Sequence, residues 1–123
     1  MNTATKLYRQ IHPTQVMDGR VSSQAFRPMP KDQNGLSVYD GDKCSAQESY
    51  EHFTRVIKGT SAGVLGVTVA ECASLQLPVR ADYETHEYHA LIDFAGKSGS
   101  AVIRHASEHL RNFAMARGWA YQP

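Results

Sequence analysis

The sequence has little cysteine, no excess of charge of either sign and no long apolar run. Its 123 residues include two cysteines, thirteen basic and twelve acidic residues, with a formal net charge of +1. Near balance of charge argues against a general nucleic-acid binder, which would present a strongly basic face. The longest apolar stretch, GVLGVTVA from Gly63 to Ala70, is far too short to cross a bilayer. We therefore expect neither nucleic acid nor membrane as a partner.

The two cysteines, Cys44 and Cys72, lack any C-x-x-C spacing. The first residues, MNTATKLYRQIHP, contain no apolar run that could serve as a secretory signal. Two such thiols in a chain without a leader are typical of reduced, unlinked cysteines in the cytosol. The sequence thus predicts a cytoplasmic protein with two free thiols.

Length and composition are those of one ordinary domain. Hydrophobic residues make up 41% of the chain and charged residues 20%, which is close to the usual values for folded domains. A chain of this length buries roughly two thirds of the surface of its unfolded form, so it needs no metal or disulfide. We predict a single compact α+β domain over residues 1–123, with a sheet of about four to five strands and two main helices.

Alternation of apolar and polar residues, together with turn residues, marks the strands. The predicted strands cover residues 6–11, 21–27, 36–39 and 89–94. GVLGVTV, at 63–69, is apolar on both alternations and predicts a buried strand at the centre of the sheet. The polar segment 78–88 is interpreted as a surface connection.

Helical spacing of apolar residues predicts two long helices, over 45–58 and 100–117. The first begins at an S-x-x-E capping box of Ser45 and Glu48, and the second follows a Gly/Ser connection with a serine cap. Their predicted buried stripes are Ala46, Tyr50, Phe53, Val56 and Ile57, and Ile103, Ala106, Leu110, Phe113 and Ala114. Gly59 and Gly118 suit the two C-terminal caps, and a second capping box at Thr68 and Glu71 predicts a short helix.

Motifs for metal, phosphate and nucleophile chemistry are incomplete. His105 and His109 have the i,i+4 spacing of a metal pair, but no third or fourth ligand accompanies them. His86 and His89 lack HExxH spacing and would point to opposite faces of an extended segment. GKSGS, at 96–100, is not a full phosphate-binding loop, and G-x-S-x-G is absent. We expect neither a metal nor a cofactor.

Polar residues gather on the predicted early strands and at the start of the first long helix. If these strands are neighbours, their ends and the helix N-terminus converge on one cleft. The candidate ligand-binding residues are Arg9, His12, Ser23, Tyr39, Glu48 and His52. Several also have a structural reading: Arg9 can cover an edge of the sheet, His12 ends a strand before a proline, and Glu48 belongs to the capping box.

Four segments carry a resemblance to a known group of proteins: LYR at 7–9, GRVSSQAF at 19–26, SVYDGD at 37–42 and SAQESYEH at 45–52. Together they resemble the front half of RES-type and ADP-ribosyltransferase-like NAD-processing domains. The resemblance implies that Arg9 meets a phosphate, Tyr39 the ribose or nicotinamide, and Glu48 the oxocarbenium-like centre. The whole chain, including GVTVAECASLQLPV and HALIDF, also resembles small uncharacterised bacterial proteins.

Two functions follow from these observations. The first is a small cytoplasmic binding or accessory module that recognises a protein partner or a small polar ligand, as immunity and antitoxin proteins do. The second is an NAD-processing enzyme. The enzyme requires an internal pocket into which Arg9, Tyr39 and Glu48 all point, whereas the module requires only a rim that exposes them.

Overall fold

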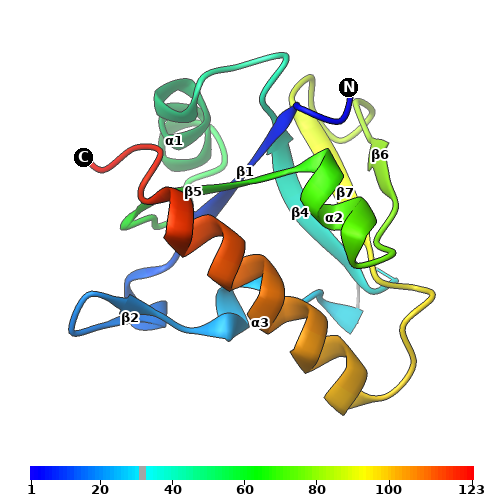
Figure 1. Ribbon diagram of the computed structural model, residues 1–123. Helices are drawn as coiled ribbons and strands as arrows, with labels where there is room; N and C mark the ends of the chain where they lie inside the picture. The colour runs from blue at the N-terminus through cyan, green and yellow to red at the C-terminus, as the bar shows by residue number, and fades with distance from the viewer. Residues whose placement is uncertain (31–32) are drawn as a thin grey trace.

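The computed structural model describes residues 1–30 and 33–123 (Figure 1). In these residues the main sheet has five antiparallel strands in the order β5-β1-β4-β7-β6. The strands are β1 (Lys6–Ile11), β4 (Gly35–Asp40), β5 (Gly63–Thr68), β6 (Val79–Ala81) and β7 (His89–Asp93). The predicted α+β class is confirmed.

Three α-helices accompany the sheet in the described residues: α1 (Ala46–Arg55), α2 (Val69–Ser74) and α3 (Ser100–Arg117). Two 3-10 helices, η1 (Pro13–Gln15) and η2 (Ser23–Phe26), flank a small hairpin of β2 (Val16–Met17) and β3 (Arg20–Val21). Both predicted long helices and the short helix after Thr68 are present. None of the helices in the described part of the chain is long and apolar enough to cross a membrane.

β1 lies between β5 and β4 in the sheet (Figure 1). Leu7 and Ile11 are fully buried in the main core, which also contains Leu110 of α3. Gln10 instead donates from Nε2 to Ser49 Oγ of α1 at 3.0 Å. Because successive side chains of a strand point to opposite faces, α3 and α1 cover opposite faces of β1.

β5 is an edge strand, so its predicted central position is wrong. It is nevertheless buried, because α1 and α3 both pack against it. The C-terminal segment also covers its outer edge: the Val64 amide donates to the Tyr121 carbonyl at 2.8 Å, and the Ala120 amide donates to the Val64 carbonyl at 2.9 Å. An apolar pattern on both alternations reports burial of both faces, and it does not distinguish an edge from a centre.

The predicted strand at 21–27 is also wrong. Only Arg20–Val21 is extended in a ladder, and the chain then turns into η2, where the Ser22 hydroxyl accepts from the Gln24 amide at 3.1 Å. Asp18 and Gly19 connect β2 to β3 with φ of 52° and 77°. Two consecutive residues with positive φ make the tight turn that Asp-Gly favours.

The C-terminal part of the first predicted helix differs from the expectation. α1 ends at Arg55, and Val56 and Ile57 are 64% and 49% exposed, so they do not complete the buried stripe. Lys58, with φ of 64°, takes the left-handed conformation expected of Gly59. Gly59 is needed for a different reason, since a Cβ there would lie 2.3 Å from the Phe53 ring.

Two smaller expectations also change. The N-cap of α3 is Gly99, with φ of 90° and no side-chain cap, where a serine was expected. The segment 78–88 is not only a connection, because Val79–Ala81 pairs with β7 as the edge strand β6. Gly118 ends α3 as predicted, with φ of 88°. Beyond it, Trp119 packs against the core.

Candidate functional site

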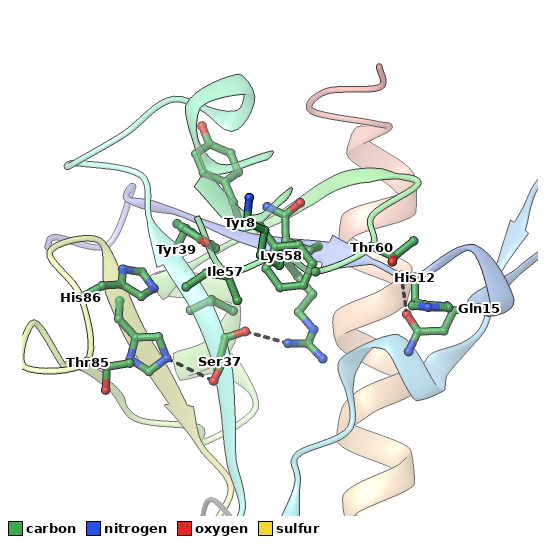
Figure 2. A pocket seen from close by; sticks show the side chains of 16 residues that line it. Tyr8, His12, Gln15, Ser37, Tyr39, Ile57, Lys58, Thr60, Thr85 and His86 are labelled. Carbon is green, nitrogen blue, oxygen red and sulfur yellow. Dashed lines mark hydrogen bonds between the residues drawn. The ribbon is translucent and has the colours of Figure 1, made fainter. Parts of the chain in front are cut away.

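The candidate site lies where β1 and β4 separate. Their register pairs Leu7 with Asp40 and Tyr8 with Tyr39, and no later pair joins these strands within the described residues. β1 continues to pair with β5, and β4 continues to pair with β7. A cavity of about 550 Å³ lies at this separation (Figure 2). Its walls come from β1, β4, the segment after α1 and the turn before β7.

Arg9 forms the charged part of the wall. Its Nε donates to the Ala25 carbonyl at 2.8 Å and its Nη1 to the Ser37 carbonyl at 2.9 Å. Burial lowers the pKa of Arg9 to about 10, so the guanidinium is still charged at neutral pH. No carboxylate in residues 1–30 or 33–123 forms an ion pair with it. A desolvated cation held only by carbonyl groups favours an anionic ligand.

Aromatic and imidazole rings form a second part of the site. The Tyr39 hydroxyl lies 2.7 Å from His52 Nδ1, and the ring centroids of Tyr39 and His86 are 5.1 Å apart with an interplanar angle of 36°. Burial raises the pKa of Tyr39, so its hydroxyl stays protonated. Burial, reinforced by the neighbouring imidazoles of His52 and His89, lowers the pKa of His86. These rings provide a surface against which a planar group can pack.

His89 connects the cavity to a short polar chain. It is 8% exposed, and its ring nitrogens face Ser37 Oγ at 3.1 Å and Asp82 Oδ2 at 3.0 Å. A hydrogen bond from Thr85 lowers the pKa of Asp82; desolvation opposes this effect, and a hydrogen bond from His89 adds to it. Asp82 is therefore ionised at neutral pH. In Figure 2 the dashed lines at Ser37 show one contact toward the cavity arginine and one toward His89.

The structure brings together only part of the set proposed from the sequence. Arg9, His12 and Tyr39 line the cavity. His52 lies outside its wall but contacts the Tyr39 hydroxyl. Ser23 and Glu48 do not line it.

The reason for the last two placements is local. Ser23 is the first residue of η2. Glu48 Oε1 accepts from the Ser45 amide at 2.9 Å, and the Glu48 amide donates to Ser45 Oγ at 3.1 Å. Glu48 therefore completes the predicted capping box and is held at the N-terminus of α1.

Sequence reasoning missed Ser37, His86, His89 and Lys58, all of which line the cavity. The expectation that His86 and His89 point to opposite faces is wrong, because the chain turns between them and their ring centroids lie 5.1 Å apart. The pattern HEYH does not reveal this turn. Ser37 and His89 are brought together by the register of β4 with β7. This register pairs Tyr39 with His89, and Ser37 lies on the same face of β4 as Tyr39.

His105 and His109 lie together on the exposed surface of α3, with their Nε2 atoms 3.1 Å apart. No group of three or more His, Cys, Asp or Glu side chains suited to a metal ion occurs in the described residues. The chain matches no family model, no curated protein and no solved structure.

Proposed function

We propose that the protein is a small binding module whose ligand is a polar molecule with a phosphate or carboxylate group. The observation that carries the proposal is Arg9, a desolvated cation on the cavity wall that donates to two carbonyl groups. A guanidinium has five N–H donors in a planar fork, and these two contacts use only part of them. The remaining donors suit two oxygens of one anionic group.

The size and the other walls of the cavity define the rest of the ligand. A volume of about 550 Å³ lies within the usual range for small-molecule sites. Lys58 adds a second cationic side chain to the wall, and Tyr39 and His86 add rings. This combination suits an anion attached to a planar or cyclic polar body. A concave site of this kind favours a small ligand over the flat surface of a protein partner.

Both thiols are free and buried, which supports a reducing compartment such as the cytoplasm as the setting of this module.

Thermal unfolding and titration calorimetry with inorganic phosphate, AMP and NAD test the proposal. A ligand that binds only the folded state at 100 times its Kd stabilises it by about 2.7 kcal/mol, which raises Tm by several degrees. Arg9→Ala should remove this shift, and Arg9→Lys should restore little of it because lysine lacks the planar fork. Arg104→Ala, on the exposed face of α3, is the matched control. No shift with any of the three probes, or an equal shift in Arg9→Ala, would contradict the proposal.

A second candidate, NAD processing, is favoured by one specific observation. Arg9 and Tyr39 both line the cavity, as the resemblance to NAD-processing domains implies. Glu48, the third residue of that set, lies outside the wall in its capping box. Release of nicotinamide from NAD, followed by chromatography, separates the two candidates. Turnover that Glu48→Gln abolishes would favour the enzyme, whereas binding of NAD without nicotinamide release would favour the module.

A further inference from the structure

Ser37, His89 and Asp82 form a hydrogen-bonded series beside the Arg9 cavity that ligand binding alone does not require. His89 Nε2 lies 3.1 Å from Ser37 Oγ, and His89 Nδ1 lies 3.0 Å from Asp82 Oδ2. A hydroxyl, an imidazole and a carboxylate in this order are the parts of a catalytic triad, which is recognised by geometry and not by position in the sequence. The sheet assembles it, because Ser37 is on β4, His89 begins β7 and Asp82 follows β6.

We propose that Ser37 is the nucleophile of an ester-hydrolysing site, with His89 as general base and Asp82 as the residue that orients His89. The substrate class is a small carboxylic ester that bears a separate anionic group. Its recognition rests on the proposed function, because Arg9 holds that anionic group.

The hydrogen bonds around His89 place its protons where this reaction needs them. An ionised carboxylate only accepts hydrogen bonds, so Asp82 accepts from Nδ1–H in the tautomer of His89 that this reaction uses. Nε2 then has a free lone pair that faces the Ser37 hydroxyl at 3.1 Å. The Thr85 hydroxyl donates to Asp82 Oδ2 at 2.6 Å and fixes the carboxylate in turn.

Ser37 is accessible from two sides. It lines the cavity of about 550 Å³ and also a second, neighbouring cavity of about 320 Å³. His89 lines both as well. A substrate can therefore place its anionic part at Arg9 and its leaving group in the second cavity, with the ester carbonyl at Ser37 between them. A histidine that only completed the packing of the sheet would not require this double opening.

The reaction balances with the residues present and water. Ser37 Oγ bonds to the ester carbonyl carbon while its proton moves to His89 Nε2, and the resulting oxyanion collapses as the carbon–oxygen bond to the alcohol breaks. His89 Nε2 returns that proton to the departing alkoxide, leaving an acyl-Ser37. Water then attacks the acyl carbon and gives a proton to His89, which passes it to Ser37 Oγ as the ester to serine breaks. The products are a carboxylic acid and an alcohol.

A donor for the oxyanion lies at the separation of β1 and β4. The Asp40 amide donates to the Tyr88 carbonyl and the Asn34 carbonyl accepts from the Phe94 amide, so both residues face β7. Antiparallel ladders alternate in direction from one residue to the next. The peptide groups of Ser37 therefore face β1, as the contact of its carbonyl with Arg9 Nη1 shows. Its amide N–H points into the opening where the oxyanion forms.

Labelling with a fluorophosphonate probe and mass spectrometry test the assignment. We expect one adduct per chain, on the peptide that contains Ser37, and no adduct in Ser37→Ala. His89→Gln and Asp82→Asn should each slow labelling by roughly 100-fold or more. Ser23→Ala, a partly buried serine outside the cavity, should label at the wild-type rate. Ser37→Cys supplies a second measurement, since a thiol beside His89 should react with iodoacetamide while Cys44 and Cys72 stay protected in the core.

Hydrolysis of two p-nitrophenyl esters tests the substrate class. The hemisuccinate, which carries a carboxylate, should have a kcat/KM about tenfold or more above that of the neutral acetate, and Arg9→Ala should remove the difference. No adduct in the folded wild type, or equal labelling of Ser37→Ala, would overturn the triad. If phosphate or AMP binds while no adduct forms, the triad fails and the binding module stands. If Ser37 is labelled while no anion binds, the proposed function fails instead.

Discussion

Replacing Arg9 with methionine separates ligand binding from stability. Burial lowers the pKa of Arg9 from 12.5 to about 10, and at 1.36 kcal/mol per pKa unit the charged form costs at most about 3 kcal/mol in this environment. Methionine removes that cost and keeps most of the apolar stem in place. The substitution should therefore stabilise the chain through this effect.

Loss of two hydrogen bonds opposes the gain. The Ala25 and Ser37 carbonyls lose their arginine donors, at about 1 kcal/mol each, although water from the cavity can reach Ser37. The free energy of unfolding of Arg9→Met, from urea denaturation, should lie within about 1 kcal/mol of the wild-type value. Affinity for the phosphate probe should fall by roughly tenfold to 100-fold. A loss of stability above about 3 kcal/mol with unchanged affinity would refute the reasoning and make Arg9 a structural clamp.

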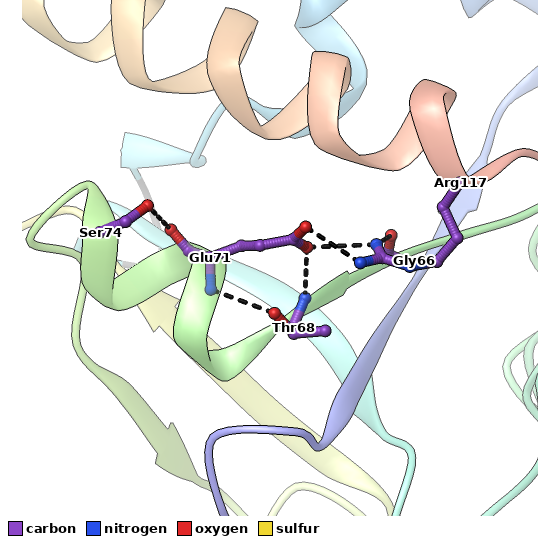
Figure 3. A network of polar contacts seen from close by, with 5 residues as sticks. All are labelled: Gly66, Thr68, Glu71, Ser74 and Arg117. Carbon is purple, nitrogen blue, oxygen red and sulfur yellow. Dashed lines mark hydrogen bonds and ion pairs between the residues drawn. The ribbon is translucent and has the colours of Figure 1, made fainter.

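Three further outcomes test the fold. Leu110 is fully buried in the core, so Leu110→Ala should lower the free energy of unfolding by about 2–5 kcal/mol in urea denaturation. Arg117 Nη2 lies 2.9 Å from Glu71 Oε2 (Figure 3). Burial acts to raise the pKa of Glu71, but hydrogen bonds from Arg117 and Thr68 outweigh it and lower this pKa. Glu71→Gln should therefore be less stable than wild type above pH 4.5, with the deficit disappearing as the pH falls through the lowered folded-state pKa. Burial raises the pKa of both thiols to about 12, so Ellman's reagent should find no thiol in the folded chain and two after denaturation.

The elements predicted well are those with a local cause. β1, β4 and β7 follow from alternation, and α1 and α2 begin at capping boxes that the structure reproduces with both reciprocal hydrogen bonds. The errors concern non-local relations. The apolar sequence of β5 indicates that both of its faces are buried, but it does not indicate which strand lies beside it. The C-terminal segment that covers the edge of β5 is far away in the sequence.

The site was predictable to a similar extent. Arg9 and Tyr39 are polar or amphipathic residues on strands that the sequence pattern predicts, and both line the cavity. Ser37 and His89 look like ordinary strand residues until the β4–β7 register places them on one face. Asp82 lies in a segment interpreted as a polar connection, and its contact with His89 depends on the path of the turn that follows β6. No local sequence pattern predicts the contacts of His89 with Ser37 and Asp82.

The separation of β1 and β4 is the feature that unites these residues. Continuing the β1–β4 register would bring Gln10 opposite Ser37, and the ladder would close the cavity. Instead, the Arg9 guanidinium donates to the Ser37 carbonyl that a ladder partner would otherwise satisfy. Exchanging a neutral ladder bond for a desolvated charge does not favour stability. A departure from local consistency that opens a cavity beside Ser37 and His89 is the pattern expected where a chain is shaped by what it binds.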